Sequence, residues 1–228
     1  MLLYGLGKMY CGFLTEYGVV MLYFIDRIPD FLPTGIISVI PEERLIKAER
    51  YNRVSDNILC KLAYYVFAYG MEKEYGVPIG SKLRWENAEN GKPFFSGYPY
   101  INFNISHCEK AVFCGLSNYP IGVDVQDVIS DTESLWHMVC TDGERERLKA
   151  SSEPDKLFTW FWCLKEAYLK HNGTGITDEL CRIDFSDFES RSFKKYGLVF
   201  SAFEMSGCCF AVCGKEGFAK NDFNNIVI

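Results

Sequence analysis

The stretch Ile121-Gly122-Val123-Asp124-Val125-Gln126 decides how we expect the second part of this chain to fold. Its apolar, strand-like character predicts an extended segment, in which side chains two residues apart point to the same face. Asp124 and Gln126 therefore share a face, and Asp127 points to the opposite one, so we do not expect it to substitute for them.

A second stretch, some forty residues on, reads Trp-Cys-Leu-Lys-Glu-Ala-Tyr-Leu-Lys over residues 162–170. In a helix, residues four apart share a face, so Trp162, Glu166 and Lys170 form one stripe. Lys165 points away from that stripe by about 100°. The strand and the helix can thus offer three oxygen donors beside a cation, an arrangement that suits Mg²⁺ carrying phosphate groups, with Mn²⁺ as the alternative.

Composition narrows the class of protein. The 228 residues are 48% hydrophobic, enough for a sizeable core in one large domain or two small ones. A net charge of −6 argues against general nucleic-acid binding by a basic surface. The 10 cysteines include no C-x-x-C pair, which favours buried free thiols in a reducing cytoplasm over a zinc or disulfide framework.

The hydrophobic pattern predicts a mixed order of strands and helices. No run of eighteen apolar residues occurs, so no membrane-spanning helix is expected. We expect a first strand over 18–25, and a basic helical segment over 41–53 that carries Arg44, Lys47, Arg50 and Arg53. The other expected elements are a helix over 56–74, strands over 83–86, 101–106, 111–116 and 121–126, helices over 133–149 and 155–171, and a hairpin of 195–200 with 207–213.

Three ordered motifs resemble those of the 4'-phosphopantetheinyl transferases, specifically the larger type that activates surfactin synthetase. The pattern G-[IV]-D-x-E falls on residues 122–126, with Gln126 in place of the second acid. The pattern W-x-x-K-E-[AS]-x-x-K is matched in full over 162–170. The G-K-P segment falls on 91–93 and F-N-[IV]-S-H on 103–107, and the resemblance runs in order over residues 41–214.

This resemblance implies an α+β fold of two similar halves related by a pseudo-two-fold axis. We expect the N-terminal half over residues 21–117 and the C-terminal half, with the metal-site motifs, over 118–228. The similar segments 111–115 and 211–214, each closing its half, agree with this division. Met21 lies where members of the family often begin, so we expect residues 1–20 to be an N-terminal extension or a misplaced start.

The resemblance also implies the reaction: transfer of the 4'-phosphopantetheine arm of coenzyme A to a serine of an apo acyl or peptidyl carrier protein, with release of adenosine 3',5'-bisphosphate. Metal ligation falls to Asp124, Glu166 and, as a weaker neutral ligand, Gln126. Glu166 is the candidate to accept the serine proton, and Lys170 to stabilise the departing phosphate. Coenzyme A contacts are expected from Lys92, Pro93, Ser106, His107, Lys170 and, among the basic residues of 44–53, Arg53.

Other interpretations stay open at this level. Glu166 with Lys170 is also an ordinary surface ion pair, His107 could be a hydrogen-bonded core residue, and Lys92 a solvated turn lysine. Two alternative functions are a catalytically impaired homologue that only binds carrier proteins, suggested by Gln126, and another coenzyme A-dependent transferase. The sequence predicts a cytoplasmic monomer that binds neither nucleic acid nor membrane, and it does not indicate which carrier protein is served.

Overall fold

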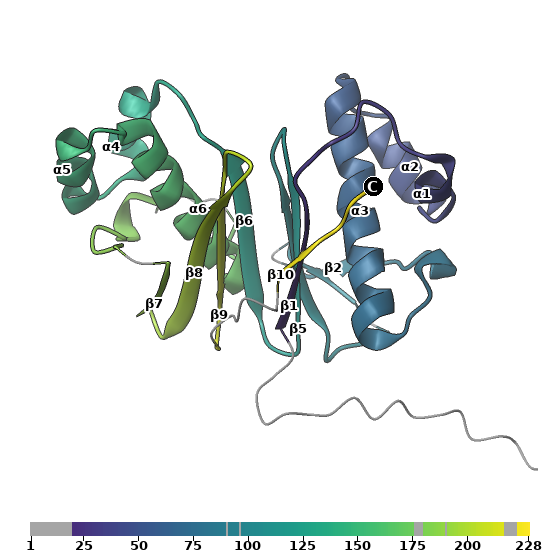
Figure 1. The fold of residues 1–228 in the computed structure, drawn as a ribbon. Helices are drawn as coiled ribbons and strands as arrows, with labels where there is room; N and C mark the ends of the chain where they lie inside the picture. The colour runs from purple at the N-terminus through teal and green to yellow at the C-terminus, as the bar shows by residue number, and fades with distance from the viewer. Residues whose placement is uncertain (1–19, 90, 96, 176–179, 190, 217–222) are drawn as a thin grey trace, which may run out of the picture.

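Two four-stranded sheets lie face to face at the centre of the molecule, and a long helix covers the outer face of each (Figure 1). The structure is a computed structural model that describes residues 20–89, 91–95, 97–175, 180–189, 191–216 and 223–228. The predicted α+β class is confirmed. The expectation of an extension over residues 1–20 falls almost wholly outside the described residues, since only Val20, the first residue of β1, is among them.

The first sheet has the strand order β10-β1-β5-β4. Helix α3 packs on it, with the shorter helices beside α3. The elements of this part are β1 (Val20–Ile25), α1 (Thr34–Ser38), α2 (Glu42–Ala48), α3 (Val54–Tyr75), η1 (Ile79–Ser81), β2 (Glu86–Asn87), β3 (Pro93–Phe94), β4 (Asn102–His107) and β5 (Val112–Ser117). Strands β2 and β3 form a separate two-stranded ribbon.

The second sheet has the order β6-β9-β8-β7, and α6 packs on its outer face. Its elements are β6 (Ile121–Asp127), η2 (Thr132–Leu135), α4 (Trp136–Val139), α5 (Asp142–Ala150), α6 (Pro154–Asn172), η3 (Leu180–Arg182), β7 (Ser192–Lys195), β8 (Leu198–Met205) and β9 (Cys208–Gly214). The short β10 (Phe223–Asn225) follows, and it pairs in parallel with β1 in the first sheet.

Alternation along β6 sorts its residues between two cores. Ile121, Val123 and Val125 enter the core between the two sheets. Gly122 and Asp124 are also buried, and because neighbouring strand residues alternate, they face the opposite side, toward α6. Asp124 therefore lies on the face of β6 that the sequence predicted, and this face packs against α6, the helix that carries the second motif.

Gly122 allows β6 and α6 to approach closely. A Cβ atom at this position would lie 1.9 Å from the Ala167 carbonyl oxygen and 2.5 Å from the His171 amide nitrogen. Only glycine leaves room for a helix backbone at that distance. The glycine of the first motif therefore sets the separation between the two elements that carry the acidic residues.

Several expected elements differ from the structure. The strand expected over 195–200 is interrupted by a two-residue turn, because Tyr196 and Gly197 both have positive φ, so the hairpin with 207–213 starts at β8 instead. The helical segment expected over 41–53 ends at Ala48.

The single helix expected over 133–149 is divided into η2, α4 and α5, because Cys140 adopts an extended conformation and Thr141 starts a new helix. Thr141 and Glu144 form a capping box, in which each side chain accepts a hydrogen bond from the other residue's backbone N–H. The strand expected over 83–86 is reduced to Glu86–Asn87.

Strand β10 connects the two halves of the chain. It pairs with β1 at Leu22, Tyr23 and Phe24, and the Phe223 ring packs edge-on against Phe203 of β8. The last residues therefore join the first sheet, and the division of the chain at 117/118 stays a prediction. Within the described residues, no helix is long and apolar enough to cross a membrane.

Candidate active site

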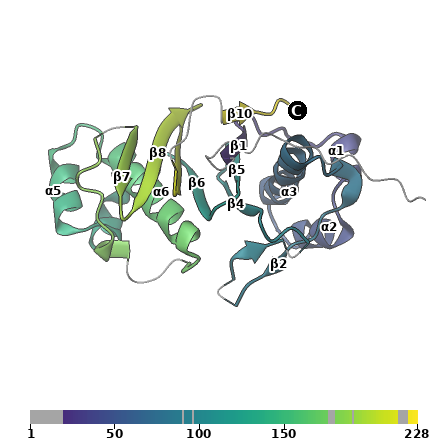
Figure 2. The same ribbon diagram turned by 90° about the horizontal axis from the view of Figure 1, so that it is seen from below.

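The site lies where β4 of the first sheet runs beside β6 of the second (Figure 2). The Asn104 side-chain oxygen accepts a hydrogen bond from the Val123 amide at 2.9 Å. Two residues further along β4, the Ser106 hydroxyl donates to Asp124 Oδ1 at 2.6 Å. Asn104 thus satisfies a backbone amide at the edge of β6, and Ser106 binds a side chain of the same strand. The two contacts hold β4 against β6 at the site.

Asp124 and Glu166 are buried carboxylates, and each has one oxygen without a partner. Asp124 Oδ1 accepts hydrogen bonds from Ser106 and, at 2.6 Å, from Lys170 Nζ. Asp124 Oδ2 and Glu166 Oε1 are buried and have no hydrogen-bond partner among the described residues. Leaving such atoms unsatisfied is costly, so the pair of free oxygens indicates a position for a cation.

A cavity of about 250 Å³ opens onto these residues. It is lined by Ile105, Ser106, His107, Asp124, Gln126, Trp162, Glu166 and Lys170. The three expected oxygen donors and Lys170 are therefore brought together, and so are Ser106 and His107. The half-buried Gln126 adds a neutral amide to the two acids.

Burial raises the pKa of Glu166 to about 6. Lys170 opposes the shift by favouring the ionised form, and Asp124 adds to it through repulsion between like charges. A carboxylate of this kind is poised to exchange a proton near neutral pH. Glu166 is therefore a buried acid, and Lys170 pairs with Asp124, so Glu166 and Lys170 do not form an ordinary surface ion pair.

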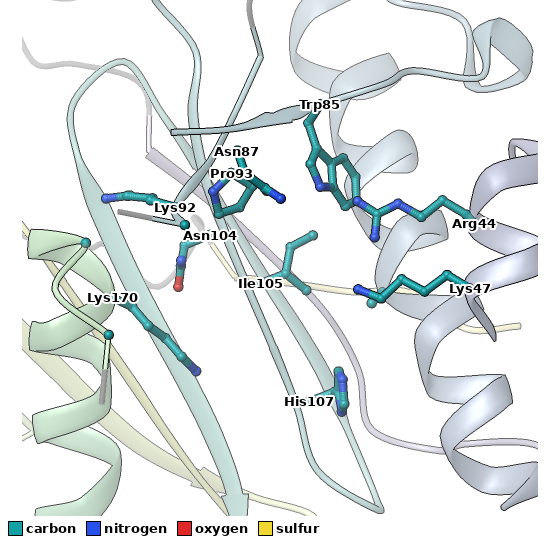
Figure 3. Close-up of a pocket in the computed structure, with 14 residues that line it drawn as sticks. Arg44, Lys47, Trp85, Asn87, Lys92, Pro93, Asn104, Ile105, His107 and Lys170 are labelled. Atoms are coloured by element: carbon teal, nitrogen blue, oxygen red, sulfur yellow. The ribbon is translucent and has the colours of Figure 1, made fainter. Parts of the chain in front are cut away.

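A larger cavity of about 500 Å³ joins the acidic one, since Ile105, His107 and Lys170 line both. Lys92 and Pro93 lie on its wall, and Figure 3 shows Lys92 and Lys170 on one side of the view and His107 at the bottom. Burial lowers the pKa of Lys92, whose Nζ donates to the His171 carbonyl at 2.7 Å. The pKa of His107 is also lowered, first by desolvation at the cavity rim and then by Lys170.

Arg44 and Trp85 are residues of this cavity that the sequence did not single out together. The Arg44 guanidinium carbon lies 3.5 Å from the centroid of the Trp85 ring, a cation–π contact that Figure 3 shows opposite Lys92. Lys47 lines the same wall. Arg53 does not line it: this residue is exposed and precedes α3 as its N-cap.

Lys165 has a structural position away from both cavities. It is fully buried, and its Nζ lies 2.6 Å from Glu144 Oε2 while also donating to the carbonyls of Val139 and Leu180. Glu144 in turn accepts from the amides of Thr141 and Phe185. The three contacts of Lys165 Nζ join α6 to α4, α5 and η3, so Lys165 positions α6 as a whole.

The donor set fits a hard divalent cation. Mg²⁺ takes one or two carboxylates from a protein and leaves its other positions to water and phosphate oxygens. The two unsatisfied carboxylate oxygens supply those ligands, Gln126 can supply a neutral third, and the adjoining basic cavity can receive phosphates.

Comparison with known proteins finds similarity to the same family that the motifs resemble. Residues 120–213 match the model of the 4'-phosphopantetheinyl transferase superfamily. The chain is 25% identical over 143 residues to the 4'-phosphopantetheinyl transferase Sfp of Bacillus subtilis, covering 62% of this chain and 63% of that protein. It is 29% identical over 133 residues to the transferase gsp of Aneurinibacillus migulanus, covering 56% and 53%.

A eukaryotic relative is similar over a shorter stretch. The chain is 30% identical over 115 residues to the L-aminoadipate-semialdehyde dehydrogenase-phosphopantetheinyl transferase of Saccharomyces cerevisiae, which covers 46% of this chain and 42% of that protein. The matches span less than two thirds of the length of these curated relatives. The resemblance carried by the motifs is confirmed: the chain is similar to the larger type of 4'-phosphopantetheinyl transferase, and its residues 120–213 match the model of that superfamily.

Proposed function

We propose that this protein transfers the 4'-phosphopantetheine arm of coenzyme A to a serine hydroxyl of an apo carrier protein, releasing adenosine 3',5'-bisphosphate. The observation that carries the proposal is the pair of joined cavities, one acidic with two unsatisfied carboxylate oxygens and one basic, with Lys170 and His107 lining both. This polarity suits a substrate with a pyrophosphate between a nucleotide and a pantetheine arm.

In this proposal the basic cavity holds the nucleotide end of coenzyme A. Lys92 and His107 donate charge-assisted hydrogen bonds to phosphate groups, and Pro93 lies on the wall of this cavity, whereas Ser106 lines the acidic cavity beside it. Arg44 and Lys47 take the place expected for Arg53 as candidates for the 3'-phosphate, because they line the cavity and Arg53 does not.

The acidic cavity positions the bond to be cleaved. Asp124 and Glu166, with Gln126, would hold Mg²⁺, which when bound supplies positive charge to the pyrophosphate. Lys170 already lies against Asp124 and would stabilise charge developing on the leaving phosphate. Glu166, ionised beside the cation, accepts the proton of the attacking serine.

We further infer that the halves 21–117 and 118–228 are related by a pseudo-two-fold axis. Strands β1-β5-β4 of one sheet and β6-β9-β8 of the other have the same order and are antiparallel throughout. The long helices α3 and α6 follow the first strand of each set and cover the outer face. That the enzyme is a cytoplasmic monomer stays a prediction.

The test is incubation with coenzyme A, Mg²⁺ and a panel of apo carrier proteins, followed by intact mass of the carriers. Asp124→Ala and Glu166→Ala should each abolish transfer with the fold retained by circular dichroism. Glu146→Ala, which removes an exposed acid on α5, should transfer at the wild-type rate. Wild-type rates in either site variant would contradict the proposed roles.

The same experiment separates the alternative functions. A catalytically impaired carrier-binding homologue would bind carriers without magnesium-dependent turnover of coenzyme A. Another coenzyme A-dependent transferase would keep the phosphopantetheine arm attached to its nucleotide, so no adenosine 3',5'-bisphosphate would appear among the products.

A further inference from the structure

A second group of ligand atoms lies at the opposite face of β6 from the active site. Cys108 follows β4, Asp127 ends β6 and Cys208 begins β9. One atom from each, a thiol sulfur or a carboxylate oxygen, lies within 4.8 Å of the others. Both cysteines are buried at the margin of the core between the sheets, and Asp127 is partly exposed.

The spacing of these atoms matches the edges of a tetrahedral site. A zinc ion with Zn–S bonds of about 2.3 Å and a Zn–O bond of about 2.1 Å requires S···S and S···O edges of about 3.8 and about 3.6 Å. The Cys108 and Cys208 sulfurs are 3.9 Å apart, and Cys208 Sγ lies 3.5 Å from Asp127 Oδ1. The third edge, from Cys108 Sγ to the Asp127 carboxylate, is no longer than 4.8 Å, so a small approach of these two groups completes the spacing for a common cation.

The Asp127 carboxylate is held so that one oxygen points to the sulfurs. Its Oδ2 accepts a hydrogen bond from the Glu109 amide at 3.0 Å. Its Oδ1 contacts Cys208 and is also 3.2 Å from Lys110 Nζ. The Lys110 side chain is 60% exposed, so its ammonium can turn into water and leave Oδ1 to a cation.

We propose that Cys108, Asp127 and Cys208 form a binding site for a thiophilic divalent cation of the zinc class, with the fourth position open to water. Two sulfur ligands favour such an ion over Mg²⁺, which prefers oxygen. Both thiols lose their protons to the solvent when the ion binds. A Cys108–Cys208 disulfide is the rival, but it requires the sulfurs to approach to about 2.0 Å and leaves the third donor without a role.

The site would join the two halves at a second point. Cys108 comes from the loop between β4 and β5 of the first sheet, whereas Asp127 and Cys208 are paired residues of the second sheet. An ion bound there would fix β4 against β6, and Ser106 and Gln126 of the candidate active site lie close along those strands. The inference does not depend on the proposed transferase activity.

The test uses the full chain, reduced and freed of metal, and titrates it with Co²⁺. One equivalent should give thiolate-to-cobalt charge-transfer absorption that Zn²⁺ then displaces, and Zn²⁺ should raise the Tm. Cys108→Ser and Cys208→Ser should each weaken binding by at least about 100-fold, and Asp127→Asn, which keeps both thiols, by about ten-fold or more. Cys60→Ser, at a buried thiol on α3, is the matched control and should bind as the wild type does.

Three results would overturn the proposal. The first is the absence of charge-transfer absorption in the wild type. The second is binding that survives in Asp127→Asn and in both serine variants, which would place the ion elsewhere. The third is formation of an intramolecular Cys108–Cys208 disulfide in place of cobalt binding, seen by intact mass as the loss of two hydrogens.

Discussion

Gln126 is the residue at which this chain departs from the acidic pattern of the family that it resembles. Its side chain lines the acidic cavity beside Asp124 and Glu166. A carboxylate binds a hard cation more tightly than an amide, so we expect Gln126→Glu to keep transfer activity and to lower the Mg²⁺ concentration for half-maximal rate by roughly ten-fold. Magnesium titration of the transfer rate measures this, with Gln126→Ala as the variant that should need more metal.

A large loss of activity in Gln126→Glu, with the fold retained, would mean that the cavity is built around the amide. In that case Gln126 would not be a metal ligand, and Asp124 and Glu166 would be the protein ligands of the metal.

Glu166 gives a prediction about pH. Its pKa in the folded protein is raised from 4.5 to about 6, so the folded state holds the proton more tightly than the unfolded chain does. The stabilising contribution of protonated Glu166 is therefore present below about pH 4.5 and is lost as the pH rises through 6. The loss is on the order of 2 kcal/mol, at about 1.4 kcal/mol for each pKa unit.

Urea unfolding in metal-free buffer measures this effect as the difference in unfolding free energy between the wild type and Glu166→Gln. The difference in unfolding free energy should change between about pH 4.5 and about pH 6 and stay level at higher pH. Added Mg²⁺ should reduce the change, since the cation favours the ionised carboxylate. A difference that is level throughout would show that burial does not perturb this residue.

Single residues also show what the sequence can predict of the site. Asp124 with Gln126, and Glu166 with Lys170, could be grouped because strand and helix periodicity fixes which side chains share a face. The contact between Arg44 and Trp85 joins residues of different elements and depends on how α2 packs, which no periodicity encodes. For the same reason Arg44 could not be chosen over Arg53 from spacing alone.

At the scale of elements, the packing of β6 on α6 sets the distance between the two acids. Gly122→Ala would place a methyl group 1.9 Å from the Ala167 carbonyl oxygen, so β6 must move away from α6. We expect a loss of about 1–3 kcal/mol in unfolding free energy, together with a large loss of transfer activity. Gly35→Ala in α1 is the matched control, since its Cβ would meet nothing within 4 Å.

Urea unfolding and the transfer assay measure both variants. If Gly122→Ala is as stable and as active as Gly35→Ala, the close approach of β6 and α6 does not determine the site.

The helix expected over 133–149 is broken near residue 140, and a local capping sequence, which the periodic pattern does not take into account, explains the break. Apolar spacing predicted one helix over 133–149, yet Thr141-Asp142-Gly143-Glu144 is a capping-box sequence that starts a helix at 142. That Glu144 also meets Lys165 could not be foreseen, because the ion pair joins α5 to α6 across the core.

At the scale of the whole molecule, β10 holds the first sheet to the second. Ile226 is buried, and its amide donates to the Phe24 carbonyl at 2.9 Å. Asp26, at the end of β1, accepts hydrogen bonds from Asn225 and from Ser206 of the second half. Deletion of residues 223–228 should therefore lower the Tm and expose the edge of β1 to pairing between chains.

Thermal unfolding and light scattering measure the two effects. Deletion of residues 227–228 alone is the control, since Val227 is 90% exposed and the strand pairing is kept. Equal Tm values and equal scattering for both deletions would contradict a role for β10 in holding the sheets together.

The sequence predicted the α+β class, because long apolar strands and amphipathic helices alternate in the order that the resemblance implies. It gave no sign that Cys108 and Cys208 meet. The two residues are a hundred positions apart, and they share no spacing of the kind that marks a metal site within one loop. Only the way in which the two sheets face each other brings the thiols together.

The pairing of β1 with β10 also has a consequence for the order of events during synthesis. Leu22 and Phe223 are partners, so about 200 residues must be translated after the first strand before its outer neighbour exists. At about 5–20 residues per second, that interval is about 10–40 s. Strand β5 can pair with the inner edge of β1 well before then, but the outer edge stays bare on the ribosome. The outer edge of β1 is therefore a point at which nascent chains on one polysome can associate before β10 is made.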